Sequence, residues 1–305
     1  MNARVSRVAV IIGVIVAAGV AAPTAQTGFA VAFYNIRSGQ GVVGLAGHPK
    51  VFDITDNCDP SRGPVDAWGT GMVQKELNRA LRDDATIALG LAEAWKCGSP
   101  KNVRAALGWK QQSEERNGVA LVARHGFAHE PEWLQLDTTR NKNPKDTMWV
   151  VHGAVCRDAR CGATIDVYAT HWSGTGPDAQ ATFDKQAQQT IDFMQRTARG
   201  PHVLIGDLNI WEGSGEVCNQ HPNNTSLQFL RKAGYVDAWP AVHGSAEGFT
   251  GMFNRNGCGR PMGYVWKRID YAWSKGVAPR AIERFGMVPA GDAAPSDHAG
   301  ILASY

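Results

Sequence analysis

The strongest constraint on the fold is a recurring pattern, in which a short apolar run ends in an acidic, amide or imidazole side chain. In the clearest example, Val-Leu-Ile-Gly at residues 203–206 leads into Asp207 and Asn209. The pattern recurs at four further places, and it delivers Asn35, Glu93, His171 and the neighbours Asp297 and His298. Strands that each present one such residue at the C-terminal end are how a layered α/β sheet builds an active site. The pattern therefore predicts one site assembled from distant segments.

The side chains that this pattern brings together suit a divalent cation and a phosphate ester. A hard cation such as Mg²⁺ prefers oxygen ligands and keeps several waters, so one or two carboxylates are enough to hold it. Asp207 and Asn209 share one turn, where the acid can hold or deprotonate a water molecule and the amide can donate to a phosphate oxygen. Gly206 lets the backbone bend tightly beneath them. For Asp207 alone, an Asx turn that closes a strand is the simpler explanation, so the prediction depends on the whole set.

The N-terminal segment has the composition of a targeting sequence. Arg4 and Arg7 precede an apolar run over residues 8–20, and small residues follow. The run is short for a membrane span, and cleavage is expected after Ala25. An uncleaved anchor is the alternative. We therefore expect a signal peptide at residues 1–25, secretion of the mature protein and one domain at residues 26–305, a size that layered α/β folds reach.

The charge of the chain does not support a strongly basic nucleic-acid binder. The formal net charge is +3, and loss of Arg4 and Arg7 with the signal leaves the mature chain near +1. Attraction to phosphates would have to come from a local patch. Arg124 and the cluster of Arg140, Lys142 and Lys145 are the candidates, although that cluster fits a solvated hairpin loop equally well.

The spacing of apolar residues predicts three helices among a larger number of strands. Thr70 and Asp178 are expected to cap the first two helices, and Thr225 to begin the third. Their apolar faces are expected to comprise Val73, Leu77 and Leu81; Phe183, Ala187, Ile191 and Met194; and Leu227 and Leu230, with Gly234 ending the third helix. Consecutive strands on either side of residues 157–160 predict an antiparallel hairpin. Periodicity alone supports a mixed α/β class.

The six cysteines of an exported chain are expected to form disulfides. Sequence alone allows about 15 pairings. Cys156 and Cys161 flank the loop of the predicted hairpin, so we expect these two to pair. The alternatives for the cysteines are free thiols or a zinc site that uses Cys218 and His221, although no second Cys/His pair at matching spacing supports zinc.

The order of the polar motifs resembles the endonuclease/exonuclease/phosphatase superfamily, whose best-known secreted member is pancreatic deoxyribonuclease. The resemblance spans residues 35–298 and rests on six blocks in family order. They are Tyr34-Asn35-Ile36-Arg37, Leu91-Ala92-Glu93, residues 117–124, Thr170-His171, Gly206-Asp207-Leu208-Asn209, and Arg268-Ile269-Asp270-Tyr271 with Ser296-Asp297-His298. The resemblance implies a four-layer α/β/β/α sandwich of two packed mixed sheets, with the site at one edge.

The resemblance also implies which residues hold a metal ion. Glu93 would be the main ligand of Mg²⁺ or Mn²⁺, with Asn35 as its neighbour and Asp297 at or next to the metal. The family usually has Gln before this Glu, whereas this chain has Ala92. The family's disulfide pattern implies a Cys218–Cys258 pair, which leaves Cys58 with Cys97.

The remaining implied residues contact the phosphate and the substrate. His298 would sit against the scissile phosphate with Asp270 behind it, because a carboxylate fixes the imidazole tautomer and raises its pKa. His171 would protonate the leaving oxygen or bond the phosphate, with a partner in residues 115–117. Arg124 would contact either a phosphate or a structural acid, and Trp172 is expected to line the substrate cleft. The expected catalytic set is His171, Asp207, Asn209, Asp270 and His298.

These residues predict a secreted, metal-dependent phosphodiesterase, with DNA or RNA as the first choice of substrate. A sphingomyelin or phospholipid phosphodiesterase is the first alternative, although no segment reads as the exposed aromatic hairpin that such enzymes use to contact membranes. A non-catalytic binding protein on the same fold is the second alternative, since fold alone does not fix function. We expect a monomer with no obligate protein partner.

Overall fold

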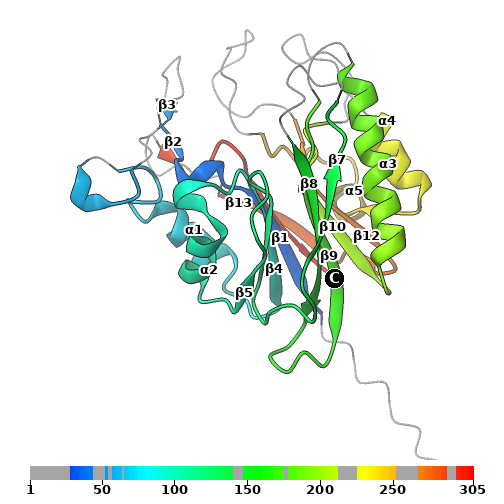
Figure 1. Ribbon diagram of the computed structural model, residues 1–305, viewed down its shortest axis with the longest axis horizontal. Coiled ribbons are helices and arrows are strands. Elements are labelled where there is room, and N and C mark those ends of the chain that lie inside the picture. Colours follow the sequence, from blue (N-terminus) through cyan, green and yellow to red (C-terminus); the bar gives the residue numbers. More distant parts are fainter. Residues whose placement is uncertain are drawn as a thin grey trace, which may run out of the picture.

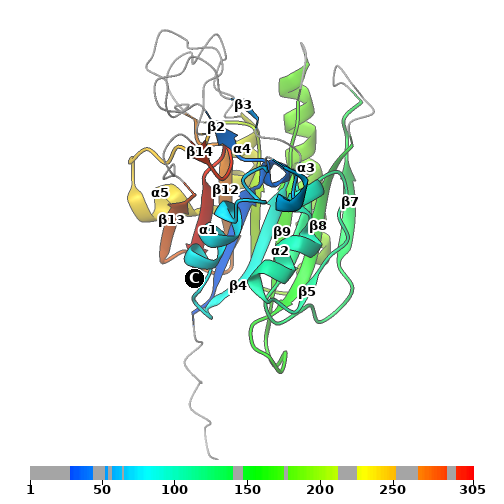
Figure 2. The ribbon, with the colours of Figure 1, turned by 90° about the vertical axis from the view of Figure 1, so that its left-hand side faces the viewer.

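The computed structural model describes residues 28–43, 52–53, 57–63, 65–139, 147–174, 178–211, 225–251, 267–286 and 293–305. The expected signal peptide at residues 1–25 and the basic cluster at residues 140–145 lie outside these ranges. Two six-stranded sheets pack face to face, and helices cover their outer faces (Figures 1 and 2). The predicted four-layer α/β/β/α sandwich is confirmed.

The first sheet has a parallel pair of strands near its centre. Its order is β13-β15-β1-β4-β6-β5, in which β1 and β4 run parallel and every other pairing is antiparallel. The strands are β1 (Ala30–Asn35), β4 (Thr86–Ala92), β5 (Gln111–Gln112), β6 (Ala120–Ala123), β13 (Ala281–Phe285) and β15 (Gly300–Ser304). The carboxyl ends of β1 and β4 therefore meet at one edge of the sheet.

The second sheet repeats this arrangement with different strands. Its order is β11-β12-β10-β9-β8-β7, and β9 and β10 form its parallel pair. The strands are β7 (Glu132–Leu136), β8 (Met148–Cys156), β9 (Thr164–His171), β10 (His202–Asp207), β11 (Val236–Asp237) and β12 (Asp270–Lys275). The antiparallel hairpin that the sequence predicts is formed by β8 and β9.

Three apolar layers hold the sandwich together. The central layer lies between the sheets, where Gly90 of β4 makes close approach possible. A Cβ at Gly90 would lie 2.9 Å from Cβ of Ala169 and from Cδ1 of Ile205, both in the opposite sheet. The outer layers pack α1 (Met72–Ala80) and α2 (Pro100–Leu107) on the first sheet, and α3 (Ala179–Thr197) and α4 (Thr225–Lys232) on the second. Burial of these layers is the main favourable contribution to folding.

Smaller elements complete the described part of the chain. A three-stranded sheet has the order β14-β2-β3, and a short helix, α5, packs on β12 and β13. The bounds of these elements are β2 (Val42–Val43), β3 (Phe52–Asp53), β14 (Ala293–Ala294), α5 (Ala238–His243), and the 3₁₀ helices η1 (Arg37–Gly39), η2 (Pro60–Arg62) and η3 (Lys96–Gly98). Among the described helices, none has the length and apolar character needed to cross a bilayer.

The predicted helices are present, with differences at their first turns. Gly71, in a left-handed conformation, precedes α1, and the Thr70 hydroxyl accepts a 3.4 Å bond from the Met72 N–H. Asp178 precedes α3 as predicted, but its side chain makes no capping bond. Thr225 begins α4 as predicted, and Gly234 follows that helix with a φ of +85°.

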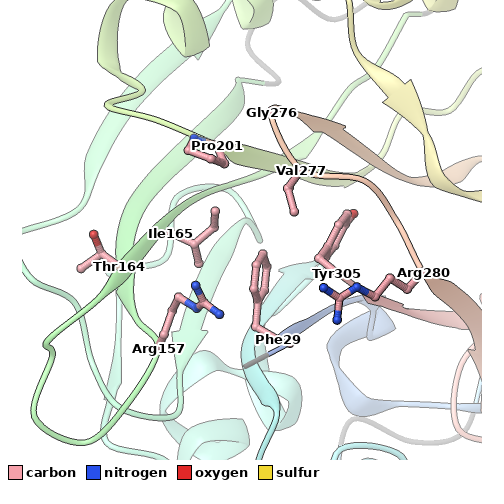
Figure 3. A pocket seen from close by; sticks show the side chains of 10 residues that line it. Phe29, Arg157, Thr164, Ile165, Pro201, Gly276, Val277, Arg280 and Tyr305 are labelled. Carbon is pink, nitrogen blue, oxygen red and sulfur yellow. The ribbon is translucent and has the colours of Figure 1, made fainter. Parts of the chain in front are cut away.

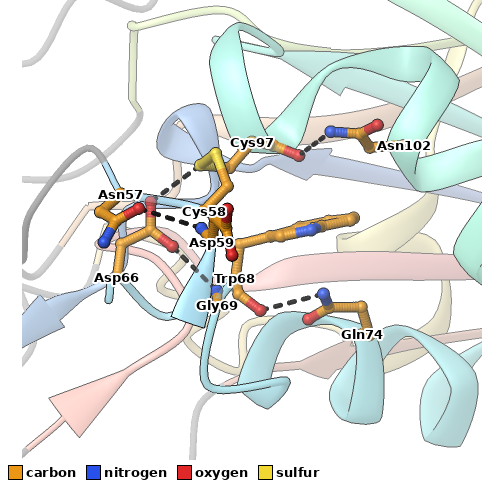
Figure 4. The surroundings of a disulfide bond; sticks show 9 residues. All are labelled: Asn57, Cys58, Asp59, Asp66, Trp68, Gly69, Gln74, Cys97 and Asn102. Carbon is orange, nitrogen blue, oxygen red and sulfur yellow. Dashed lines mark hydrogen bonds between the residues drawn. A yellow bond between two sulfur atoms is a disulfide. The ribbon is translucent and has the colours of Figure 1, made fainter. Parts of the chain in front are cut away.

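Two of the expected disulfides are present. Cys156 pairs with Cys161 across the β8–β9 loop, and Cys58 pairs with Cys97 of η3 (Figure 4). Their Cα–Cα distances are 4.6 Å and 5.5 Å, within the range of ordinary disulfides. The expected Cys218–Cys258 pair falls outside the described residues. Disulfides of this kind are typical of proteins that function outside a reducing cytosol.

Candidate active site

The polar strand ends from both sheets meet at one edge of the sandwich. Asn35 ends β1 and pairs in register with Ala92, so Glu93 follows directly beside it. In the second sheet, Asp207 pairs with His171 of β9 on one side and with Asp270 of β12 on the other. The two parallel strand pairs thus place their C-terminal side chains within reach of each other across the sandwich.

Asn35 is the residue that joins the two halves of the site. Its side chain is fully buried, and its amide nitrogen donates to Oε1 of Glu93 at 3.0 Å and to Oδ2 of Asp207 at 3.1 Å. The same nitrogen lies 3.5 Å from Nε2 of His298. Its amide oxygen accepts a bond from the Arg37 N–H at 3.2 Å. The amide therefore fixes one carboxylate from each sheet relative to the other.

A histidine–carboxylate pair forms the second part of the site. Nδ1 of His298 lies 3.0 Å from Oδ2 of Asp270, and Nδ1 also lies 3.8 Å from Oδ2 of Asp207. The Thr250 hydroxyl accepts a 3.0 Å bond from the Asp270 N–H, and the Ser296 hydroxyl accepts one of 3.2 Å from the His298 N–H. The geometry is that of a carboxylate that orients an imidazole.

Burial and neighbouring acids set the protonation of this pair. Burial alone would lower the pKa of His298, but the charges of Asp270 and Asp207 and the bond to Asp270 raise it well above its usual value. Burial raises the pKa of Asp270, the His298 charge opposes this shift, and the Asp207 charge adds to it. These charges therefore favour the cationic form of the imidazole, which can donate from Nε2.

His171 and Asn209 form the third part. The Asn209 amide nitrogen donates to the Trp172 carbonyl at 2.8 Å and lies 3.0 Å from Nε2 of His171, which is itself 3.6 Å from Oδ2 of Asp207. Oδ1 of Asp207 accepts a 3.0 Å bond from the Asn209 N–H. The Asx turn considered as an alternative is thus present, and it places Asp207 within the site.

The backbone around these side chains is strained in a consistent way. Among the described residues, those with positive φ that are not glycine include Arg37 (46°), Ser38 (54°), Glu93 (49°), Asn117 (47°) and Asn209 (52°). Left-handed backbone costs free energy in residues with a Cβ, and it persists where the surrounding structure enforces it. Such residues gather at functional sites, and sequence analysis does not reveal them.

Asp297 is placed differently from the other expected metal ligands. Its Oδ2 accepts a 3.1 Å bond from Nη1 of Arg37, and the Arg37 residue is only 6% exposed, whereas the Asp297 side chain is 29% exposed. Arg37 lies in the Asn-Ile-Arg motif that carries the resemblance, but the motif alone gives no sign of this ion pair. The structure therefore makes Asp297 a partner of a buried cation at the margin of the site.

The donor set of the site fits a hard divalent cation. Ligand atoms of Asp207, Asp270 and His298 lie within 4.8 Å of one another, and Glu93 lies across Asn35 from Asp207. Carboxylate oxygens predominate, which is the chemistry that Mg²⁺ and Mn²⁺ prefer. Acids held this close favour a cation between them because their charges otherwise repel.

Arg124 does not reach the site, so its expected phosphate contact is wrong. It follows β6, which runs antiparallel to β4 and ends at the opposite edge of the sheet. Its guanidinium donates to the carbonyls of Thr86 and Leu81, both at 2.7 Å, and of Asp83 at 2.9 Å. It also donates to the Asp84 carboxylate at 2.8 Å. The structural salt bridge, which was the alternative for Arg124, is therefore what the structure shows.

Trp172 does not line a substrate cleft, so that expectation is also wrong. The residue is 0% exposed and packs between the second sheet and α3. Its backbone still serves the site, because its N–H donates to the Asp207 carbonyl at 2.9 Å and its carbonyl accepts from Asn209. Trp172 thus positions two site residues without contacting substrate.

The expected partner of His171 in residues 115–117 is not what the structure pairs with it. The Glu115 carboxylate accepts from the Gly118 N–H, and the Asn117 amide donates to the Thr147 carbonyl. His171 instead faces Asn209. The pair forms because His171 ends β9 and Asn209 lies two residues beyond β10, which is the parallel neighbour of β9.

A small cavity lies at the opposite edge of the sandwich (Figure 3). Its volume is about 100 Å³, and its lining includes Phe29, Arg157, Arg280 and Tyr305. The Phe29 and Tyr305 rings stack at 5.3 Å, and the Arg157 guanidinium lies 4.9 Å from the Phe29 ring. None of the expected site residues lines this cavity, so the chemistry is concentrated at the other edge.

Comparisons with solved structures show the fold. An endonuclease/exonuclease/phosphatase from Beutenbergia cavernae is 19% identical, with a TM-score of 0.61 over 91% of this chain and 71% of that one. D. rerio TDP2 complexed with single-strand DNA product is 11% identical, with a TM-score of 0.57 over 92% and 99% of the two chains. A mannosyl-6-phosphatase from Bacteroides thetaiotaomicron is 16% identical, with a TM-score of 0.57 over 90% and 98%.

The sequence comparisons identify the family. No curated protein matches the chain. The sequence model of the Endonuclease/Exonuclease/phosphatase family matches residues 58–298, which is most of the chain and includes every expected site residue except Asn35. The chain therefore belongs to the endonuclease/exonuclease/phosphatase family.

Proposed function

We propose that the protein is an exported, Mg²⁺- or Mn²⁺-dependent phosphodiesterase that hydrolyses DNA or RNA. Enzymes of this family are generally divalent-metal-dependent hydrolases of phosphoric esters. The observation that carries the proposal is the buried Asn35 amide, which joins Glu93 and Asp207 and faces His298. Two disulfides and the basic, apolar N-terminal segment support export.

The residues of the site divide the work of in-line attack by water. Glu93, with Asn35 beside it, would hold the cation, which when bound would offset the negative charge that develops on the phosphate. Asp207 would orient the attacking water and accept its proton. His298, kept cationic by Asp270, would donate from Nε2 to a phosphoryl oxygen.

Asn209 and His171 act together at the other side of Asp207. The two N–H groups of the Asn209 amide face the Trp172 carbonyl and the His171 ring. This arrangement suits an orienting role for Asn209 better than direct contact with the phosphate. His171 would then donate a proton or a hydrogen bond to the leaving oxygen. A covalent phospho-enzyme is not needed.

The substrate class rests on weaker support than the reaction. The structurally similar proteins include a TDP2 complexed with single-strand DNA product and a mannosyl-6-phosphatase, so the fold serves more than one phosphoric ester. Among the described residues, the exposed large hydrophobic side chains are Trp95, in the loop between β4 and η3, and Val236, in β11 of the other sheet, and the two form no apolar cluster for a membrane. We therefore favour a soluble polyanion over a lipid.

Removal of the metal and of the acids tests the reaction. Excess chelator should abolish turnover, and added Mg²⁺ or Mn²⁺ should restore it. Asp207→Asn should lower kcat by about 10²–10⁴-fold without unfolding, which circular dichroism checks. Glu93→Gln should raise the metal concentration needed for half-maximal rate. The matched control is Asp84→Asn, since that acid lies at the opposite edge beside Arg124. Full turnover in excess chelator would reject the metal-dependent mechanism.

A substrate panel tests the specificity. The mature protein should cleave plasmid DNA or RNA and should turn over sphingomyelin vesicles and sugar phosphates slowly or not at all. Each positive substrate should lose its turnover with Asp207→Asn, which separates this enzyme from a contaminant. Robust sphingomyelin or sugar phosphate hydrolysis without nucleic-acid cleavage would reject the nuclease and leave the phosphoric ester hydrolase.

A further inference from the structure

We propose that Trp95 is a stacking platform for a nucleobase next to the scissile phosphate, an inference that rests on the proposed nuclease function. Trp95 lies two residues after Glu93 and is 36% exposed. In the described part of the chain, the other exposed large hydrophobic side chain is Val236, on the outer strand of the other sheet. Trp95 follows the proposed metal ligand closely in the chain, and its exposed indole offers a planar apolar face on which a base could stack.

The indole of Trp95 packs against the backbone turn at Gly118, which also lies against Glu93. Gly118 has a φ of +80°, and a Cβ there would lie 2.9 Å from Cε2 and Cζ2 of Trp95 and 2.9 Å from Cα of Glu93. The ring therefore lies against the Gly118 backbone. The Ala94 N–H donates to the Gly118 carbonyl and the Trp95 N–H to the Glu93 carbonyl, both at 2.9 Å. Only glycine at position 118 permits this contact.

The segment after Trp95 is also fixed. Cys97 of η3 is bonded to Cys58, and its carbonyl accepts a 3.1 Å bond from Asn102 (Figure 4). A Cβ on Gly98 would lie 2.8 Å from the Gly39 nitrogen, so η3 packs closely on η1, which follows Asn35. The platform is thus preorganised relative to both Asn35 and Glu93. A preorganised aromatic surface binds with little loss of conformational entropy.

Charge near the site leaves a role for stacking. Arg116, on the same turn as Gly118, pairs with Glu114 at 3.3 Å, and its guanidinium lies 4.8 Å and 5.0 Å from the rings of Trp133 and Trp149. The guanidinium of Arg116 is therefore engaged within the protein. Each base offers a planar π face to an aromatic ring whatever its sequence. The polar neighbours of Trp95, which include Glu93 and Lys96, suit a solvated strand better than an acyl chain.

Single-stranded oligonucleotides with and without a base at the cleaved position test the platform. Trp95→Ala should raise KM on the intact strand by roughly 5- to 100-fold and leave kcat within about 3-fold. Trp95→Phe should retain most of the affinity, since it keeps an aromatic face. For the wild type, an abasic nucleotide should raise KM as much as Trp95→Ala raises it on the intact strand. For Trp95→Ala, the abasic nucleotide should raise KM little further. Val236→Ala is the matched control and should behave as wild type.

Binding without cleavage gives an independent readout. In the Asp207→Asn background, a strand that carries 2-aminopurine should be quenched on binding, and Trp95→Ala should remove the quenching. Wild-type kinetics in Trp95→Ala, or an equal loss on intact and abasic strands, would overturn the platform while leaving the nuclease in place. Absence of cleavage of both strands by the wild type would overturn the proposed function, and the platform with it.

Discussion

Within the described residues, two histidine–aspartate pairs that are mostly shielded from solvent have nearly the same nitrogen–oxygen distance. Nδ1 of His298 lies 3.0 Å from Oδ2 of Asp270, and Nε2 of His152 lies 2.8 Å from Oδ1 of Asp166. The first pair belongs to the site, whereas the second lies between β8 and β9, on the side covered by α3. The pair alone does not distinguish a reactive histidine from a structural one.

In the structural pair the carboxylate of Asp166 is held by favourable hydrogen bonds, and the second ring nitrogen of His152, Nδ1, lies 3.6 Å from Oε1 of Glu132. The His152 ring stacks on Tyr168 at 4.4 Å, and the second oxygen of Asp166 accepts a 2.9 Å bond from the Arg199 N–H. Burial alone would raise the pKa of Asp166, but the bonds from His152 and Arg199 outweigh it and lower that pKa. The fold therefore favours the charged form of this carboxyl.

In the site, a second acid, Asp207, acts on the carboxylate of the pair itself. The pKa of Asp270 is raised by burial and by the charge of Asp207, and the His298 charge offsets only part of this rise. The fold therefore disfavours the charged form of Asp270, which the chemistry needs behind His298. Active sites commonly trade stability for function in this way.

The largest expected difference between the pairs is in activity. His298→Asn should lower kcat on the nucleic-acid substrate by about 10²–10⁴-fold, because it removes the proposed phosphate donor. His152→Asn should leave kcat within about 2-fold in the folded fraction, since its contacts are remote from the site. Initial rates, normalised to folded protein by circular dichroism, decide this. Equal losses of kcat in the two variants would mean that the surroundings of a pair do not determine whether its histidine takes part in the reaction.

Replacement of the aspartate should destabilise the protein more in the structural pair than in the site, which is the opposite of the order expected for activity. Asp166→Asn should lower the free energy of unfolding by about 2–4 kcal/mol, because it breaks a buried pair whose charged form is favoured. Asp270→Asn should change it by less than about 1 kcal/mol, or raise it, because it removes a charge that the fold disfavours. Urea unfolding at pH 7 with chelator measures both. A larger loss for Asp270→Asn would contradict the proposed trade-off.

The site could be predicted from sequence to the extent that strand ends define it. Asn35, Asp207 and His171 follow apolar runs, and the parallel pairing of those runs brings their ends together. Strand direction is what the sequence does not give. Arg124 also follows an apolar run, but β6 is antiparallel to β4. The same pattern therefore places Arg124 at the edge of the sheet opposite the site.

Side-chain direction accounts for the other differences. Trp172 directly follows His171, and successive side chains of an extended segment point to opposite faces. His171 faces the site, so Trp172 enters the core beneath α3. Asp297 carries the right chemistry but meets Arg37, a long-range pair that no local pattern reveals. Such contacts are set by tertiary packing, which motif spacing does not encode.

The smallest and most specific test of the comparison is the dependence of stability on pH. Because the folded pKa of Asp166 lies below its ordinary value of 3.8, the unfolded chain binds more protons between the two pKa values. The stability of the wild type relative to Asp166→Asn should therefore rise with pH in that window and be fully present above pH 3.8. The folded pKa of Asp270 lies above 3.8, so in a second window, between 3.8 and that folded pKa, the folded chain binds more protons than the unfolded chain. The stability of the wild type relative to Asp270→Asn should then fall as the pH rises through this window, by no more than about 1.4 kcal/mol per pH unit.

Urea unfolding of the wild type and both variants from pH 3 to pH 6, with chelator present, gives the two difference curves. Slopes of the same sign would show that the two carboxyl groups experience similar surroundings, and the distinction between the structural and the reactive pair would have to be sought outside their electrostatics.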